Sequence, residues 1–114
     1  MTSGFKIVVY PVRDLAQAKA LYGTLLGVEP YADEGYYVGF RVGDQEVGLD
    51  PNGHGQGLAA PLAYWDVDDI EGCLERLIDA GAEVQQAITD VGGGKLIASV
   101  KDADGNVTGL VQPA

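Results

Sequence analysis

The chain has 114 residues, enough for one domain or for two small modules that share a core. Seven basic residues against seventeen acidic ones give a net charge of −10, which repels phosphate backbones and argues against nucleic-acid binding. The apolar fraction of 46% is ordinary for a globular protein, and no apolar stretch approaches the ~18 residues of a membrane span. A single cysteine and the lack of a signal-peptide pattern favour the cytoplasm.

The first half of the chain reads as a strand, a helix and three short strands. β-Forming residues fill 5–12, and apolar positions recur at helical spacing over 15–26. Asp14 is placed to cap the start of this helix, and Gly27 is placed to end it. Strands are expected near 28–33, 35–42 and 45–50, with a hairpin turn between the last two.

A glycine-rich segment, 51–60, is predicted to link this half to a second copy. A new strand begins at Leu62, and Asp69 then takes the capping role of Asp14. Apolar residues at helical spacing follow to Ile78. The last three strands are expected near 83–90, 95–101 and 106–112.

The two halves share a phrase at the start of each helix. Val12-Arg13-Asp14-Leu15 returns 55 positions later as Val67-Asp68-Asp69-Ile70. Because such internal repeats indicate duplicated structural units, we predict an α+β fold of two tandem βαβββ modules. The modules span about 5–50 and 61–113 of a single domain over 1–114.

These motifs give the chain a resemblance to a known family. Besides the repeated phrase, they are Leu21-Tyr22, Leu26-Gly27, Ala80-Gly81 and the turn Asp102-Ala103-Asp104-Gly105-Asn106, where Ala103 replaces a usual proline. The chain resembles the vicinal oxygen chelate superfamily, which includes glyoxalase I, extradiol dioxygenases, fosfomycin-resistance enzymes and bleomycin-resistance proteins. The resemblance implies a glyoxalase/bleomycin-resistance-like fold and leaves the chemistry open, since one fold hosts many functions.

The resemblance also implies where a metal would be held, at two positions in each repeat. These positions correspond to Ile7, Gly48, Leu62 and Gly109. None has a donor atom in its side chain, so we expect a metal-free variant without a cofactor. The only histidine, His54, lies in the predicted linker and is interpreted as an ordinary loop residue.

Strand alternation suggests which side chains line a concave ligand site. If Leu62 faces the concavity, Tyr64 and Asp66 face it too, and Ile7 faces it from the first strand. An aromatic ring beside a carboxylate suits a planar or cationic molecule, although the two residues also fit a core tyrosine and a strand-end aspartate. Further candidates are Tyr37, for which Tyr36 is the alternative, and Asp50, whereas Asp44 and Glu46 are interpreted as solvated hairpin charges.

The leading functional hypothesis is a metal-independent small-molecule-binding protein of the bleomycin-resistance-like type, with an aromatic or cationic ligand. The alternative is a lyase or isomerase in which Asp66 acts as general base and Tyr64 or Tyr37 orients an oxygen. An interaction subunit without a ligand is a third possibility. Because the concave face is apolar around Ile7 and Leu62, we expect a homodimer, with the cavity formed within one chain or between two.

Overall fold

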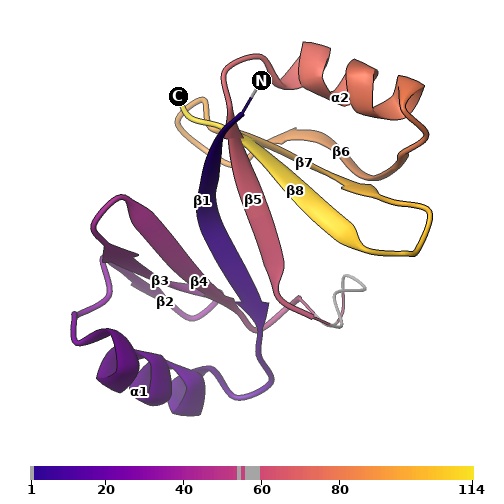
Figure 1. Cartoon of the computed structure of the whole chain (residues 1–114). Helices are drawn as coiled ribbons and strands as arrows, with labels where there is room; N and C mark the ends of the chain where they lie inside the picture. Colours follow the sequence, from indigo (N-terminus) through magenta and orange to yellow (C-terminus); the bar gives the residue numbers. More distant parts are fainter. Residues whose placement is uncertain (1, 54, 56–59) are drawn as a thin grey trace. The chain divides into compact units, whose positions relative to one another are not determined.

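A computed structural model describes residues 2–53, 55 and 60–114 and divides the chain into two compact units. The first unit comprises Ile7–Leu62, and the second comprises Met1–Lys6 together with Ala63–Ala114. The boundary at Lys6 falls inside strand β1 (Thr2–Pro11), so this strand contributes residues to both units (Figure 1).

The first unit is a four-stranded sheet with one helix. Its strand order is β2-β3-β4-β1, in which β3 runs antiparallel to both neighbours and β4 runs parallel to β1. The bounds are α1 (Leu15–Leu26), β2 (Ala32–Glu34), β3 (Tyr37–Val42) and β4 (Gln45–Asp50).

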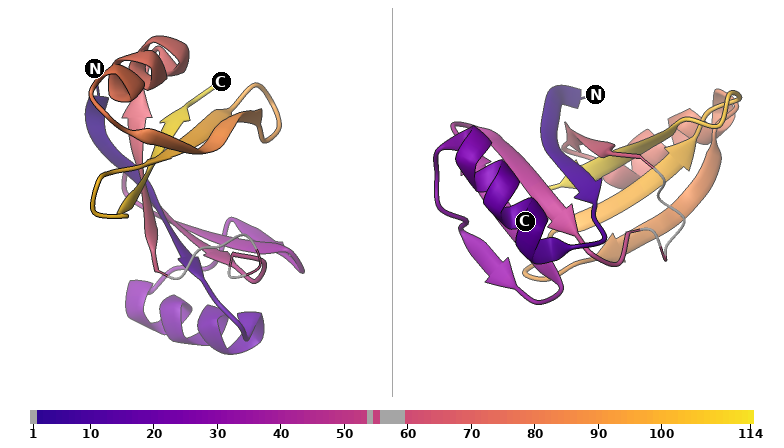
Figure 2. Two further views of the ribbon diagram at one scale, coloured as in Figure 1. Left: turned by 90° about the vertical axis from the view of Figure 1, so that its right-hand side faces the viewer. Right: turned by 90° about the horizontal axis from the view of Figure 1, so that it is seen from below.

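The second unit repeats this arrangement. From the N-terminal part of β1 the order is β1-β5-β8-β7-β6, with β5 parallel to β8 and the other two described pairs antiparallel (Figure 2). The bounds are β5 (Leu62–Val67), α2 (Ile70–Asp79), β6 (Glu83–Asp90), β7 (Leu96–Lys101) and β8 (Val107–Gln112). The described residues therefore form eight strands and two helices, which confirms the predicted α+β class.

Both helices begin at the predicted aspartates. Asp14 accepts a 3.0 Å hydrogen bond from the backbone N–H of Gln17, and Asp69 accepts one of 3.1 Å from Gly72. Each carboxylate satisfies a backbone donor that has no partner within its helix, which stabilises the first turn. Gly27 ends α1 in the left-handed conformation, with φ of 70°, as the sequence predicts.

Each helix packs on one face of its own sheet. In the first unit, Val38, Phe40 and Leu49 are buried against Ala18 of α1. In the second, the helix-facing core is built from the larger set Val67, Ile70, Ala98, Leu110, Trp65, Cys73, Leu74, Leu77, Ile88 and Leu96. Because neighbouring side chains on a strand point to opposite faces, the intervening residues of β4, β5 and β8 lie on the faces that the helices leave uncovered.

The strand expected near 28–33 is much shorter than predicted. Only Ala32–Glu34 forms β2, because Pro30 has no N–H to donate to a sheet. At the start of the chain the strand is instead longer than predicted: β1 begins at Thr2, whose hydroxyl donates a 2.7 Å hydrogen bond to the Asp66 carbonyl oxygen. Within the described residues, no helix is both long and apolar enough to cross a membrane.

Candidate functional site

The helix-free sheet face of the first unit carries three β4 residues. Glu46, Gly48 and Asp50 alternate along this strand with the side chains that pack against α1. On β1, Ile7 lies opposite Glu46 and Val9 lies opposite Gly48. The face therefore brings two carboxylates to the side of the strand that also carries Gly48, one of the positions that the resemblance assigns to a metal ligand.

Glu46 is held in this face by a tyrosine and an arginine. It is only 9% exposed, and its Oε1 accepts a 2.6 Å hydrogen bond from the Tyr31 hydroxyl. Arg41 Nη2 lies 3.9 Å from the same oxygen, and its guanidinium carbon lies 4.3 Å from the Tyr31 ring centroid. Among residues 2–53, 55 and 60–114, neither a hydrogen bond nor an ion pair engages Glu46 Oε2. The interpretation of Glu46 as a solvated charge is wrong, whereas Asp44 is exposed as expected.

A short backbone contact explains why the sequence did not reveal this burial. Tyr31 precedes β2, and its N–H donates a 2.9 Å hydrogen bond to the carbonyl oxygen of Gly39 on β3. This bond brings the Tyr31 ring across the sheet, where a Cβ at Gly39 would lie 2.8 Å from ring carbons. The ring then reaches Glu46, fifteen residues later in the chain.

A second tyrosine lies over Gly48. A Cβ built at Gly48 would lie 2.7 Å from Tyr37 Cζ and closer still to the Tyr37 hydroxyl. Real side chains do not approach one another so closely, so only glycine leaves room for this ring. The Tyr37 hydroxyl consequently occupies space that a ligating side chain at position 48 would need.

The phenols of this face are held in their neutral form. Partial burial, the hydrogen bond to Glu46 and nearby negative charge raise the pKa of Tyr31 above its ordinary value. Burial and the charge of Glu46 raise the pKa of Tyr37, with a smaller contribution from Asp50, while the hydrogen-bonding contact between the Tyr31 and Tyr37 hydroxyls lowers it. Although 44% of Tyr31 is exposed, its hydroxyl is the end that meets buried Glu46.

The second unit has a corresponding glycine and tyrosine. A Cβ at Gly109 on β8 would lie 2.7 Å from Tyr64 Cε1 and 2.8 Å from Cγ, and nearer still to Cδ1. Gly109 lies opposite Tyr64 in the parallel pairing of β8 with β5. The base of the ring is thus fixed close to the backbone, and Tyr64 is 8% exposed.

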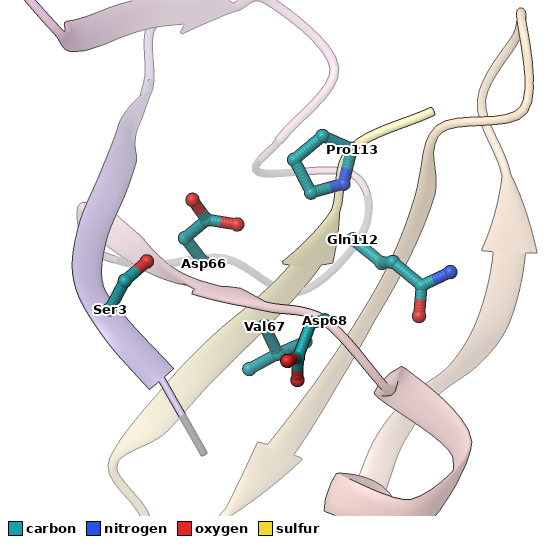
Figure 3. A pocket seen from close by; sticks show the side chains of 6 residues that line it. All are labelled: Ser3, Asp66, Val67, Asp68, Gln112 and Pro113. Atoms are coloured by element: carbon teal, nitrogen blue, oxygen red, sulfur yellow. The ribbon is translucent and has the colours of Figure 1, made fainter.

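The second unit also contains a pocket beside the ends of β5 and β8. Its cavity volume is about 360 Å³, within the range of small-molecule sites. Figure 3 shows the Asp66 carboxylate and the Ser3 side chain on strands β5 and β1 at one side of it. The lining residues are Ser3, Asp66, Val67, Asp68, Gln112 and Pro113.

The polar groups of this pocket are mostly hydrogen-bond acceptors. Asp66 and Asp68 supply two carboxylates, and the Gln112 side-chain oxygen accepts a 2.8 Å hydrogen bond from the N–H of Ile70 at the start of α2. That bond fixes the Gln112 amide against the helix. The pocket can therefore offer negative charge and hydrogen-bond acceptors to a ligand.

The structure distributes the predicted ligand-binding residues over both units. Asp66 lines the pocket of the second unit, whereas Tyr64, on the same sheet face, covers Gly109 and does not line the pocket. Both lie on the face away from α2, as the alternation predicts, since Trp65 and Val67 pack with the helix.

The remaining candidates belong to the first unit. Ile7, Tyr37 and Asp50 lie on its helix-free face, and Leu62 is buried with 3% exposure. His54 lies outside the described residues. The Tyr31–Glu46 pair was not predictable from the sequence, because no local pattern joins a residue before β2 to one on β4.

Comparison with known families agrees with the motifs and the topology. The model of the Glyoxalase/Bleomycin resistance protein/Dioxygenase superfamily matches residues 4–110. The chain belongs to this superfamily. A comparison with curated proteins finds no match.

Several solved structures share the superfamily fold. A superfamily member from Vibrio splendidus 12B01 is 18% identical over 93% of this chain and 95% of its own, with a TM-score of 0.72. Methylmalonyl-CoA epimerase from Mycobacterium tuberculosis is 19% identical over 99% and 89%, with a TM-score of 0.73. A Streptomyces coelicolor methylmalonyl-CoA epimerase variant in complex with 2-nitronate-propionyl-CoA is 17% identical over 100% and 96%, with a TM-score of 0.76. These likenesses confirm the predicted glyoxalase/bleomycin-resistance-like fold.

The residues at the four positions that the resemblance assigns to a metal have no donor atoms in their side chains. Ile7 and Leu62 are hydrocarbons, while Gly48 and Gly109 have no side chain and lie beneath tyrosine rings. No three His, Cys, Asp or Glu residues in the described part of the chain are grouped so that they could hold a metal. The tyrosine rings leave no space for a ligating side chain at Gly48 or Gly109, which supports the expectation of a metal-free variant. That expectation stays a prediction.

Substituting alanine for either covered glycine should destabilise the protein. We expect Gly48→Ala and Gly109→Ala each to lower the free energy of unfolding by about 1–3 kcal/mol, because the new methyl group overlaps a tyrosine ring. Gly109→Ala should cost more, since the base of the Tyr64 ring cannot swing away. Denaturant unfolding measures both.

Gly35→Ala is the matched control for these variants. An added Cβ there meets nothing within 4 Å, and the residue has no positive φ, so a change within about 0.5 kcal/mol is expected. Equal effects at positions 35, 48 and 109 would contradict the proposed overlap.

Two of the tyrosines of the first unit, those on its helix-free face, should titrate late. Of the six tyrosines, Tyr31 and Tyr37 should remain protonated above the ordinary phenol pKa of ~10. Because the folded state then binds these protons more tightly than the unfolded chain, stability should be unaffected below pH ~10 and should fall as the pH rises further.

Phenolate absorbance during an alkaline titration measures this behaviour. Glu46→Gln should shift the late ionisations to lower pH, because it removes the charge that disfavours a second anion. Six tyrosines that ionise together in the folded protein would contradict the environment described for this face.

Proposed function

We propose that this protein binds a small cationic or aromatic molecule without using a metal ion. The observation that carries the proposal is the pocket of about 360 Å³ in the second unit, which is lined by two aspartates and polar side chains. Its size suits a small molecule, and its carboxylates favour a positive charge. The tyrosine rings over Gly48 and Gly109 support a function that does not depend on the superfamily's metal.

Selectivity for charge has to come from the pocket itself. The chain's net charge of −10 attracts cations from solution, but salt at ~0.1 M screens that field within ~10 Å. A carboxylate in the pocket wall acts at much shorter range. Asp66 is the best placed, because it lines the pocket and is half-buried.

Asp66→Asn should remove this preference while leaving the fold intact, since the two side chains are nearly the same size. Planar cationic compounds are expected to raise the melting temperature more than anionic compounds of similar size, and to shift the backbone amide resonances of residues 66–68 and 112. In the variant, the affinity for the cationic compounds, obtained from the titration of these resonances, should fall about tenfold. This is the effect expected for loss of a charged hydrogen-bond partner.

Asp44→Asn is the matched control, because it changes the net charge equally at an exposed turn in the first unit. It should leave binding at the pocket unchanged. If Asp66→Asn and Asp44→Asn weaken binding alike, general electrostatics would account for the effect and the pocket would not.

A metal-independent isomerase or lyase is the second candidate. It is favoured by the fold shared with methylmalonyl-CoA epimerases, and Asp66 would then act as general base on a bound carbon acid. The two functions are distinguished by incubating the protein with compounds that bind. Turnover that Asp66→Asn abolishes would establish the enzyme, and unchanged compounds would support the binding protein.

We also propose that the protein is a cytoplasmic homodimer. Native mass spectrometry of protein prepared without chelator should give twice the 11.9 kDa chain mass and no additional mass from a metal. Elemental analysis of the same sample should find well under one equivalent of zinc, nickel, manganese or iron. A stable monomer would contradict the dimer, and stoichiometric metal that survives His54→Ala would contradict the metal-free assignment.

A further inference from the structure

We propose that the first unit has its own cation-binding site, at the carboxylate–phenol face formed by Tyr31, Tyr37 and Glu46. The site would take an amidinium or ammonium group, and it lies where β4 carries one of the superfamily's metal-ligand positions. It goes beyond the function proposed for the pocket, because no residue is common to the two sites.

The buried carboxylate of Glu46 is incompletely paired. Glu46 is 9% exposed, and the Tyr31 hydroxyl and Arg41 both engage its Oε1. Within the described ranges, Oε2 has neither a hydrogen-bond donor nor a cation. A buried carboxylate oxygen normally accepts hydrogen bonds, so this atom is a place where a ligand N–H would be stabilised.

Tyr37 supplies a second polar group to this face. Its hydroxyl lies above Gly48, two residues along β4 from Glu46, and the charge of Glu46 acts on it directly. The phenol stays neutral and its oxygen can accept a hydrogen bond. A cation bound at Glu46 Oε2 would thus meet a neutral phenol on the same sheet face.

The face carries an excess of negative charge. Glu46 and Asp50 contribute two negative charges on β4, Glu34 contributes a third on β2 opposite Tyr37, and Arg41 contributes one positive charge on β3, which leaves a net charge of −2. The β1 residues paired with this part of β4, Ile7 and Val9, are apolar. One monovalent cation would therefore reduce this excess of negative charge, and Asp50 would add attraction from beyond Gly48.

Arg41 limits the affinity of this site in the native chain. Its side chain is 58% exposed, and the 3.9 Å distance to Glu46 Oε1 is long for an ion pair. A guanidinium held so loosely competes with a ligand cation for the same carboxylate. Its removal should therefore tighten binding, an effect that loss of structure would not produce.

The test compares benzamidine with its neutral and anionic analogues, benzamide and benzoate. Titrations are performed on the full chain carrying Asp66→Asn, so that binding in the second unit's pocket is weakened. Calorimetry gives affinity, and the amide resonances of residues 45–50 show where binding occurs. We expect benzamidine to shift these resonances, with benzamide and benzoate at least about tenfold weaker.

Three variants in this background decide the outcome. Glu46→Gln should weaken benzamidine binding about tenfold or more, whereas Glu75→Gln, the same charge change at an exposed position on α2, should leave it unchanged. Arg41→Met should strengthen it about threefold, because the competing guanidinium is gone. Preserved dispersion of the amide resonances will show that each variant is folded.

The proposal is overturned if benzamidine does not shift residues 45–50, if Glu46→Gln binds as tightly as its parent, or if Arg41→Met weakens binding. It is also overturned if benzamide binds as well as benzamidine, because charge would then play no part. The proposed function of the pocket would fail separately, through the resonances of residues 66–68 and 112, so the two results are distinguishable.

Discussion

Strand alternation under a one-sided helix layer is the constraint on which the rest of this structure depends. Each module has a single helix, so one face of its sheet packs against that helix in the hydrophobic core. The other face is not covered by a helix and can carry polar side chains. On β4 the alternation separates Leu49, buried against α1, from Glu46 and Asp50 on the other side. A one-residue slip in register would turn the carboxylates into the core, so the packing of the helix also fixes the site.

The free-energy cost of burying Glu46 in the helix-free face of the first unit is reduced by neighbouring polar and charged groups. Burial of an isolated carboxylate is costly, and Glu46 avoids most of that cost through the Tyr31 hydroxyl and the nearby Arg41. Tyr31 is itself held by a backbone hydrogen bond to Gly39 and by the arginine above its ring. These contacts make the carboxylate part of the folded framework and leave one of its oxygens for a ligand.

The sequence predicted the features that depend on neighbours in the chain. Asp14, Asp69 and Gly27 act within a few residues of themselves, so their roles at the helix ends were readable, as was the outward face of Asp66 on β5. The burial of Glu46 was not readable, because it requires Tyr31 to cross the sheet from before β2. Pocket residues Ser3 and Gln112 were missed for the same reason: they meet Asp66 only through the pairing of distant strands.

The tyrosine rings over Gly48 and Gly109 have a consequence for how this chain can change over evolutionary time. A glutamate at position 48 would meet Tyr37, and loss of the Tyr37 ring alone would uncover a glycine that binds nothing. Each single step is therefore unfavourable, and only paired substitutions lead to a ligating side chain. The tyrosine and the glycine beneath it are thus mutually dependent, so substitution at either position is constrained by the residue at the other.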